Sequence, residues 1–448
     1  MAKRSVRYVC TNCGEPAQSW SGKCPRCGEW NTLQEEVVSD AVMSGAATAG
    51  RKLEAAAVNT LAARDEKRMR SKLADVDAVL GGGVVHGSVV LIAGQPGIGK
   101  STLLLQLADA ISKQHKVLYV SGEESGHQVG LRAHRLGVQA KHLQLATSTS
   151  ADDIAASIAA KEHDLVIVDS IQTVATEGVS SAAGSVSQIT NSARVILQAA
   201  KQHGVAVVLV GHVTKEGAIA GPKVLEHVVD VVLQLEGDRY GGFKVLRATK
   251  NRFGPTSEAG IFEMVDEGLR AVANPSAALL AERQASDGSV VLATLEGTRP
   301  LLVEVQALVN KTSYGYPKRA ASGMDLNRLN LLVAMLEKRT KLSLAEQDIY
   351  INIVGGIRLS EPAADLAVCM AIGSAAKGLQ LQEHAVVFGE VGLSGEVRHV
   401  PFADKRMQEA KKLGFTAAIG PAQREGKKLA GLHSVPDVRS ALNQFLGQ

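Results

Sequence analysis

The sequence predicts an α/β protein with a P-loop core, preceded by a small zinc knuckle and followed by a C-terminal α+β domain. Four of the 5 cysteines lie before residue 28, a glycine-rich phosphate-binding pattern spans 94–101, and short strand and helix patterns mix after residue 274. From these observations we place the zinc knuckle at 1–34, a linker at 35–72, the core at 73–273 and the C-terminal domain at 274–448.

The composition is that of a globular protein. Hydrophobic residues make up 45% of the 448 positions and charged residues 21%, so the chain can fill two or three cores. The formal net charge of +4 tolerates a polyanionic partner without requiring one. No apolar run approaches the roughly 18 residues of a membrane-spanning helix, and the charged N-terminus has no apolar signal region behind it. We therefore expect a cytoplasmic protein with no membrane partner.

Apolar runs alternate with amphipathic stretches through the core. The runs predict buried parallel strands at Val89–Ala93, Val117–Ser121, Leu165–Asp169 and Val205–Gly211. Helical spacing separates them at Ser101–Lys113, His127–Leu136, Ala151–Lys161 and Val186–Gln202. This alternation predicts a doubly wound sheet. An antiparallel extension is expected at Val228–Leu235, Phe243–Thr249 and Gly260–Val265.

The C-terminal domain mixes both element types. Strands are predicted at Val290–Leu295, Ile349–Ile353 and Ala385–Phe388, and helices at Asn327–Arg339, Ala363–Ala376 and Lys405–Leu413.

The pattern G-x-x-x-x-G-K-[ST] occurs between a predicted strand and a predicted helix. Its residues, with the one that follows, are Gly94, Gln95, Pro96, Gly97, Ile98, Gly99, Lys100, Ser101 and Thr102. Glycines let backbone N–H groups turn toward phosphate oxygens, and a helix N-terminus adds positive potential. We expect Lys100 to contact the β- and γ-phosphates of ATP and Ser101 to ligate Mg²⁺. The alternative is an ordinary glycine-rich turn, which this context disfavours.

Two acidic positions complete the predicted nucleotide site. Asp169 ends a buried strand and, beside a P-loop, is interpreted as the second Mg²⁺ ligand rather than as a helix cap. Glu123 and Glu124 follow the strand after the P-loop helix. We favour Glu123 as the base that orients the attacking water, with Glu124 and a solvated loop pair as the alternatives. His212 and Lys215 follow another strand, where His212 either senses the γ-phosphate or caps the strand.

The N-terminal cysteines form two C-x-x-C pairs separated by ten residues. Cys10, Cys13, Cys24 and Cys27 are predicted to hold one structural Zn²⁺, in preference to a redox role. Trp20 and Trp30 are expected to pack against this knuckle, which has little other core. Cys369 lies in an apolar stretch and is expected to be a small core residue.

The knuckle, the P-loop and the segment Lys250-Asn251-Arg252-Phe253-Gly254, in this order, resemble the bacterial DNA repair proteins of the RadA (Sms) family. The resemblance covers essentially the whole chain. It implies a RecA-like ATPase core, a C-terminal domain similar to the Lon protease domain, and a hexameric ring that moves on single-stranded DNA. It also implies branch migration of recombination intermediates and a RecA-type recombinase as partner. Lys250 and Arg252 would then act in trans on a neighbour's γ-phosphate, whereas without the resemblance they are a solvated turn.

Two glycine-rich loops are candidates for DNA contact. They are Thr176–Ser187 and Thr214–Leu225, and Lys215 and Lys223 in the second can pair with phosphates. Neither loop carries a stacking aromatic, and flexible connections are the alternative.

The C-terminal domain lacks the residues of a Lon-type Ser–Lys dyad. Ala363 stands at the position of the serine nucleophile, and Asp404 at that of the lysine, with Lys405 one residue along. Alanine has no nucleophilic atom, so we expect a non-proteolytic scaffold. A second DNA-binding surface or a plain charged surface is expected from Lys311, Lys318, Arg319 and Arg328.

Three functions compete on these observations. The first is a DNA-dependent ATPase of helicase-like character, and the second is an ATP-dependent protease, which Ala363 disfavours. The third is a RecA-like regulatory ATPase that switches state without DNA translocation.

Overall fold

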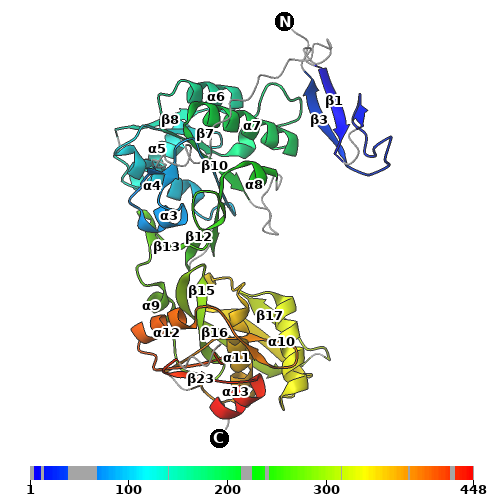
Figure 1. Ribbon diagram of the computed structural model, residues 1–448, viewed down its shortest axis with the longest axis vertical. Coiled ribbons are helices and arrows are strands. Elements are labelled where there is room, and N and C mark those ends of the chain that lie inside the picture. The colour runs from blue at the N-terminus through cyan, green and yellow to red at the C-terminus, as the bar shows by residue number, and fades with distance from the viewer. Residues whose placement is uncertain are drawn as a thin grey trace, which may run out of the picture. The chain divides into compact units, whose positions relative to one another are not determined.

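The computed structural model describes residues 5–11, 15–38, 68–139, 141–212, 224–237, 242–313, 315–381, 384–423 and 429–446 (Figure 1). The chain forms two compact units, one of residues 1–234 with 249–254 and one of residues 235–248 with 255–448. Over the described ranges, no helix combines the length and the apolar character that crossing a bilayer requires. The predicted domain boundaries at 34, 72 and 273 stay predictions.

A small antiparallel sheet forms the N-terminal part of the first unit. Its strands are β1 (Ser5–Cys10), β2 (Pro16–Ala17) and β3 (Leu33–Val38), in the order β2-β1-β3. Among the residues that the structure describes here, Cys10, Cys24 and Leu33 form the buried cluster, and two of these side chains are thiols. Such a core is too small to hold a fold without a further cross-link.

The rest of the first unit is a mainly parallel sheet. Its strands are β6 (Val89–Gly94), β7 (Val117–Ser121), β8 (Leu143–Thr147), β9 (Leu165–Asp169), β10 (Ala206–His212) and β11 (Val231–Gly237). The order β11-β6-β10-β9-β7-β8 includes parallel pairing from β6 through to β8. The predicted doubly wound sheet is therefore confirmed. Strand β8 was not predicted, because it lies at the sheet edge and is largely exposed.

Helices cover both faces of this sheet. They are α3 (Ala74–Val79), α4 (Lys100–Ser112), α5 (Gly126–Arg135), α6 (Ala151–Ala159), α7 (Val186–His203) and α8 (Val224–Val228). The unit also contains the 3-10 turn η1 (Ile171–Thr173) and two short strands that pair with each other, β4 (Arg68–Met69) and β5 (Val84–Val85). One core cluster packs alternate residues of β7 and β9, such as Leu118 and Val166, against Ile154 of α6 and Ile189 of α7. The intervening residues of these strands face the other side, where α4 lies (Figure 1).

Of the predicted antiparallel extension, Val228–Leu235 corresponds to β11, and antiparallel pairing is found at the start of the second unit for the strands that match Phe243–Thr249 and Gly260–Val265. Strands β12 (Lys244–Asn251), β13 (Ala259–Val265) and β14 (Gly268–Ala271) pair in sequence as a meander, although the last residues of β12 belong to the first unit.

A seven-stranded mixed sheet follows. Its strands are β15 (Ser289–Glu296), β16 (Arg299–Lys311), β17 (Arg319–Ser322), β18 (Gln347–Ile353), β19 (Ala385–Val387), β22 (Ala417–Gly420) and β23 (Leu432–Ser434). The helices are α9 (Pro275–Leu280), α10 (Leu326–Arg339), α11 (Asp365–Lys377), α12 (Ala403–Lys412) and α13 (Val438–Phe445), with the 3-10 turns η2 (Val354–Gly356) and η3 (Pro362–Ala364) and the hairpin of β20 (Glu390–Val391) and β21 (Val397–Arg398). The predicted C-terminal strands and helices are found with end shifts of a few residues.

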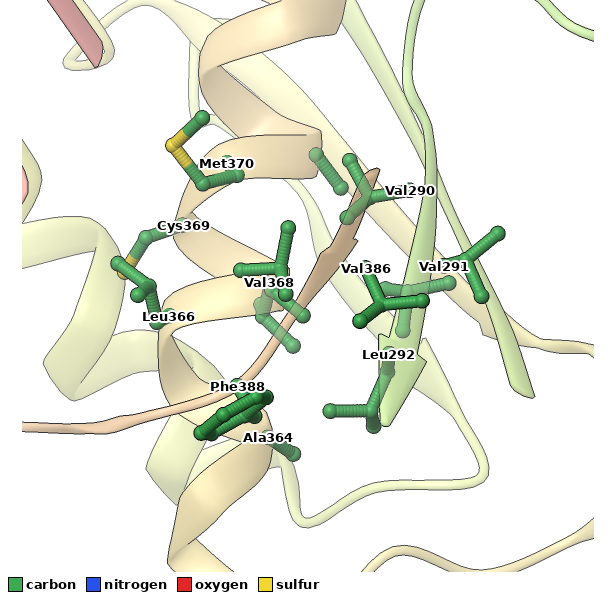
Figure 2. Packing of buried hydrophobic residues seen from close by; sticks show 14 of the residues in the cluster. Val290, Val291, Leu292, Ala364, Leu366, Val368, Cys369, Met370, Val386 and Phe388 are labelled. Atoms are coloured by element: carbon green, nitrogen blue, oxygen red, sulfur yellow. The ribbon is translucent and has the colours of Figure 1, made fainter. Parts of the chain in front are cut away.

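Helix α11 is the centre of the second core. It is buried from Asp365 to Ser374 and packs on β15 and β19, as Figure 2 shows for Val368, Leu292 and Val386. Cys369 lies within this cluster, and burial raises the pKa of its thiol well above the usual range. The prediction that Cys369 is a core residue is confirmed.

A fully buried arginine joins α12 to this core. The Arg406 guanidinium donates to the Ala293 carbonyl at 2.7 Å and pairs with both carboxylate oxygens of Glu361. The buried guanidinium thus has a counter-ion in the partly buried Glu361, and removing Arg406 leaves that carboxylate uncompensated.

We expect Arg406→Ala to lower the free energy of unfolding of the second unit by about 3 kcal/mol or more, because Glu361 would keep its charge without a counter-ion. Thermal unfolding followed by circular dichroism measures this, with the exposed Lys411→Ala on the same helix as the control. Equal melting temperatures for the two variants would contradict the assignment of a structural role to the pair.

Candidate nucleotide and metal sites

The phosphate loop joins the end of β6 to the start of α4. Gly97 and Gly99 have φ of +79° and +114°, in the left-handed region that a side chain disfavours. Gln95 and Pro96 are exposed, whereas Ile98 is buried at 1% exposure and fixes the loop to the core. Ser101 and Thr102 are half-buried and occupy the first turn of α4. The loop therefore presents backbone N–H groups at a helix N-terminus.

Lys100 folds back over this loop. Its Nζ donates to the carbonyls of Gly94 at 2.9 Å and Gln95 at 3.1 Å, and lies 3.2 Å from Nδ1 of His212. Burial lowers the pKa of Lys100 to about 8, against the opposing charges of Asp169 and Glu123. The ammonium thus donates to two neutral carbonyls of the loop. Charged phosphate oxygens are stronger acceptors than these carbonyls and would replace them.

Glu123 lies in the same cluster. Its Oε1 accepts from Ser170 Oγ and lies 3.1 Å from Nε2 of His212. Because Lys100 donates to Nδ1, the proton of a neutral His212 resides on Nε2 and is donated to Glu123. This hydrogen bond is the main cause that lowers the pKa of Glu123 to about 2, so its carboxylate is ionised at neutral pH.

The neighbouring Glu124 points elsewhere. Both of its carboxylate oxygens accept from the Arg132 guanidinium of α5 at 2.6 Å. The two consecutive carboxylates therefore diverge, one toward Lys100 and one toward α5.

Asp169, at the end of β9, is buried and accepts a hydrogen bond of 2.6 Å from the Tyr119 hydroxyl at Oδ2. Burial, followed by the charge of Asp169, raises the pKa of Tyr119 above its usual range, so the hydroxyl donates. The Asp169–Ser170 peptide is cis.

The loop that carries Glu123 is fixed by its backbone. Gly122 donates to the Asp169 carbonyl at 2.8 Å, and a Cβ on Gly122 would lie 2.3 Å from Thr173 Oγ1. Ser121 Oγ donates to the Glu124 carbonyl at 2.7 Å. The structure thus brings Lys100, Glu123, Asp169 and His212 together at the C-terminal ends of the parallel strands. Tyr119, Ser170 and Arg132 were missed, since no local spacing marks them.

The segment Lys250–Gly254 makes its contacts within the first unit. Lys250 Nζ donates to the carbonyls of Glu226, His227 and Val229 at 2.8 to 3.0 Å, at the end of α8. Burial and the neighbouring charge of Arg252 lower its pKa. Arg252 pairs at 3.3 Å with Asp230, and its side chain is 57% exposed.

Asp230 is buried and links this segment to the sheet. Its Oδ2 accepts from the backbone N–H of Val89 at 2.9 Å, at the start of β6, and pairs with Lys201 of α7. Gly254 in turn packs against Gly81, and a Cβ on Gly254 would lie 2.8 Å from the Gly81 Cα. The turn is therefore held at a defined place on the unit.

Three of the four predicted zinc ligands are described, and they converge. The sulfur atoms of Cys10, Cys24 and Cys27 all lie within 4.8 Å of one another, with 3.6 Å between Cys10 and Cys27. Backbone N–H groups, chiefly that of Cys27, lower the pKa of the Cys24 thiol, which favours the thiolate that binds metal. Cys13 lies outside the described residues. The donor set fits a thiolate-rich Zn²⁺ site.

The packing predicted for the tryptophans is wrong. Trp20 and Trp30 are 59% and 68% exposed, and Trp30 contacts Lys23 in a cation–π arrangement at 5.7 Å. The metal cross-link makes a large apolar core unnecessary in this short segment.

The candidate DNA-binding segments are described unequally. Thr176–Ser187 is anchored by Gln188, which bonds the backbone of Thr176 and Val179. In the second loop, residues 213–223, with Lys215 and Lys223, lie outside the described residues. In the C-terminal domain Arg328 pairs with the buried Asp365.

The remaining basic candidates and the dyad positions differ in exposure. Lys311 and Lys318 are exposed, and Arg319 donates to the carbonyls of Lys318 and Leu344. Ala363 is 1% exposed, Asp404 is exposed, and the Lys405 ammonium lies over the Phe402 ring.

Three stretches of the chain match models of known families. Residues 8–35 match a family model described as a rubredoxin metal binding domain, residues 55–218 an AAA domain, and residues 330–424 the subunit ChlI of Mg-chelatase. Fold and site together define a RecA-like P-loop ATPase that uses ATP and Mg²⁺, with an N-terminal Zn²⁺ ribbon and a ChlI/Lon-like C-terminal domain.

Full-length relatives then specify the family. The chain is 50% identical over 432 residues to "DNA repair protein RadA" of Brucella abortus, covering 94% of this chain and 92% of that one. The Bacillus subtilis protein of that name is 47% identical with complete coverage of both chains, and the Escherichia coli one 42% identical over 99% of this chain and 100% of that one. The chain belongs to the RadA family. A solved RadB recombinase structure aligns with 46% of this chain and 99% of its own, at 23% identity and a TM-score of 0.37.

We expect Cys24→Ser to remove most of the bound zinc, because a hydroxyl replaces a thiolate ligand. Metal content after gel filtration measures the loss. Trp20 and Trp30 are the 2 tryptophans of the chain, so tryptophan fluorescence reports on the ribbon alone. Cys369→Ala is the control and should keep one zinc per chain; a Cys24→Ser protein with full zinc content would exclude the site.

We expect Glu123→Gln to lower kcat for ATP hydrolysis about 10²-fold or more, since the amide cannot accept a proton. Glu124→Gln should keep kcat within several-fold, because that carboxylate is held by Arg132. Steady-state hydrolysis by both variants decides between them, and a reversed order would move the role to Glu124.

Proposed function

We propose that the protein is an ATP-dependent motor that binds single-stranded DNA and promotes branch migration of intermediates in homologous recombination and DNA repair. Membership in the RadA family supports the repair role, and the phosphate site supports the energy source. A RecA-type recombinase is the proposed protein partner.

The observation that carries this proposal is the contact of His212 with both Lys100 and Glu123. When ATP binds, Lys100 exchanges the Gly94 and Gln95 carbonyls for phosphate oxygens. His212 then loses or changes one of its two partners. Because His212 ends β10 and the candidate DNA loop Thr214–Leu225 follows it, the nucleotide state is passed to that loop.

The residues of the site have distinct proposed roles. Backbone N–H groups of the loop and Lys100 hold the phosphates, and Ser101 and Asp169 hold Mg²⁺, which neutralises charge on the phosphate oxygens. Glu123 stays ionised and orients the attacking water, accepting its proton as the γ-phosphoryl group departs.

A ring requires cations that reach across subunits. In the proposed hexamer Arg252 and Lys250 act on a neighbour's γ-phosphate. Arg252 suits this better in the present conformation, because its side chain is largely exposed and, among the described residues, pairs with Asp230 alone. Lys250 is held by three carbonyls and in this conformation fixes the turn from which Arg252 projects.

The C-terminal domain is proposed to be a non-proteolytic scaffold. Ala363 offers no nucleophile, and its burial at 1% exposure leaves no access for a peptide carbonyl. The exposed Lys311 and Lys318 are proposed to contribute to a second DNA-binding surface. Arg328 contributes less, since its charge is compensated by Asp365.

A regulatory ATPase that switches without moving DNA is the second candidate function. The same His212 relay supports it, because a sensor needs only to report the nucleotide state to a loop. Movement of DNA distinguishes the two.

We expect single-stranded DNA to raise the rate of ATP hydrolysis about tenfold or more at moderate salt, with Lys100→Ala reducing hydrolysis about 10²-fold. Lys113→Ala, an exposed lysine at the end of the same helix, is the matched control. Extension of a three-strand DNA junction in the presence of ATP then tests movement.

Hydrolysis that ignores DNA at low and moderate salt would end the motor proposal and favour the regulatory ATPase. Stimulation by DNA without junction movement would leave a DNA-responsive switch.

A further inference from the structure

A tyrosine hydroxyl is buried beside the carboxylate at the end of β9. Tyr119 lies in the middle of β7 and is 1% exposed. Its hydroxyl donates to Oδ2 of Asp169 at 2.6 Å, a short distance typical of a hydrogen bond to a charged acceptor. None of the roles assigned above uses this residue.

The strand register places the two side chains on the same face of the sheet. In the parallel pair β7–β9, Tyr119 is opposite Ile167 and Ser121 is opposite Asp169. Residues two apart on a strand share a face, so Tyr119 and Asp169 both face away from the α6–α7 layer. Tyr119 lies two residue pairs before the pair that contains Asp169, and the length of the phenol carries its hydroxyl forward to the carboxylate.

The hydroxyl has a directed role because burial leaves it few acceptors. A buried phenol needs a hydrogen-bond partner, and the other charged groups facing it are Arg132 and Glu124, which pair with each other. The Tyr119 hydrogen bond thus goes to Asp169. A terminal carboxylate torsion is broad and two-fold, so this bond selects one orientation of Asp169.

We propose that Tyr119 is a positioning residue that orients Asp169 and thereby sets the affinity of the nucleotide site for its divalent cation. With Oδ2 occupied by the hydroxyl, the carboxylate is held in one rotamer before the cation arrives. Partners of this kind around a metal ligand are commonly worth 10- to 100-fold in metal affinity. The inference rests on the proposed role of Asp169 as a Mg²⁺ ligand.

The test is Tyr119→Phe in the full-length protein, which removes one oxygen atom and keeps the ring in the core. We expect the Mg²⁺ concentration for half-maximal ATP hydrolysis to rise about tenfold, with kcat at saturating Mg²⁺ within about twofold. Mn²⁺ binding in the presence of ADP, followed by electron paramagnetic resonance, should weaken by the same factor without any turnover. Tyr350→Phe on β18 removes a hydroxyl from the other unit and should change neither value.

Asp169→Asn, alone and combined with Tyr119→Phe, distinguishes a failure of the proposed role of Asp169 from a failure of the inference about Tyr119. Asp169→Asn should itself weaken Mn²⁺ binding, and adding Tyr119→Phe to it should weaken binding little further, because the hydroxyl acts through the carboxylate. If Asp169→Asn leaves cation affinity unchanged, the proposed role of Asp169 fails and this inference with it. If Asp169→Asn weakens binding while Tyr119→Phe only lowers the melting temperature, Tyr119 is merely structural and this inference alone is overturned. Tyr119→Leu provides the same comparison should the phenylalanine variant be insoluble.

Discussion

Parallel pairing of β6, β10, β9 and β7 is the constraint on which the nucleotide site depends. Parallel strands end at the same edge of a sheet, and ligands of open α/β sheets bind at that edge. The pairing gathers Lys100 and His212, which are 112 positions apart, and Glu123 and Ser170, which are 47 apart. Each of these groups is partly or fully removed from water, so their mutual hydrogen bonds are strengthened and a missing partner is costly. The site is therefore a single network rather than a set of independent side chains.

Opposite ends of the same strands carry a second network. Asp230 is 2% exposed and receives the Val89 N–H, the Lys201 ammonium and the Arg252 guanidinium. A carboxylate with three donors is well compensated for its burial. In the second unit, the charge of the buried Arg406 is compensated by a bidentate pair with Glu361. In both units, a buried charge ties together segments that are distant in sequence, while the apolar cores between them supply most of the packing.

Sequence patterns located the elements that have local signatures. The P-loop, the apolar strands of the core and the converging cysteines are read from neighbouring residues, because periodicity and spacing are local properties. Tyr119–Asp169, Glu124–Arg132 and Glu361–Arg406 were not predicted, since each depends on which strand or helix lies beside which. Strand β8 was not predicted from the sequence, because a strand at the side of a sheet is partly exposed and does not require an apolar run. The packing of Trp20 and Trp30 was wrong because a metal-linked ribbon obtains its stability from thiolates and leaves large apolar side chains exposed.

The attachment of Asp230 to the first residue of β6 has a mechanical consequence. The strand whose far end becomes the phosphate loop is anchored at its near end to the turn that carries Arg252. A displacement of the Arg252 side chain would therefore not be confined to a flexible surface loop. It would act through the buried Asp230 carboxylate on β6, a strand of six residues that starts beside the Arg252 turn and ends at the phosphate loop.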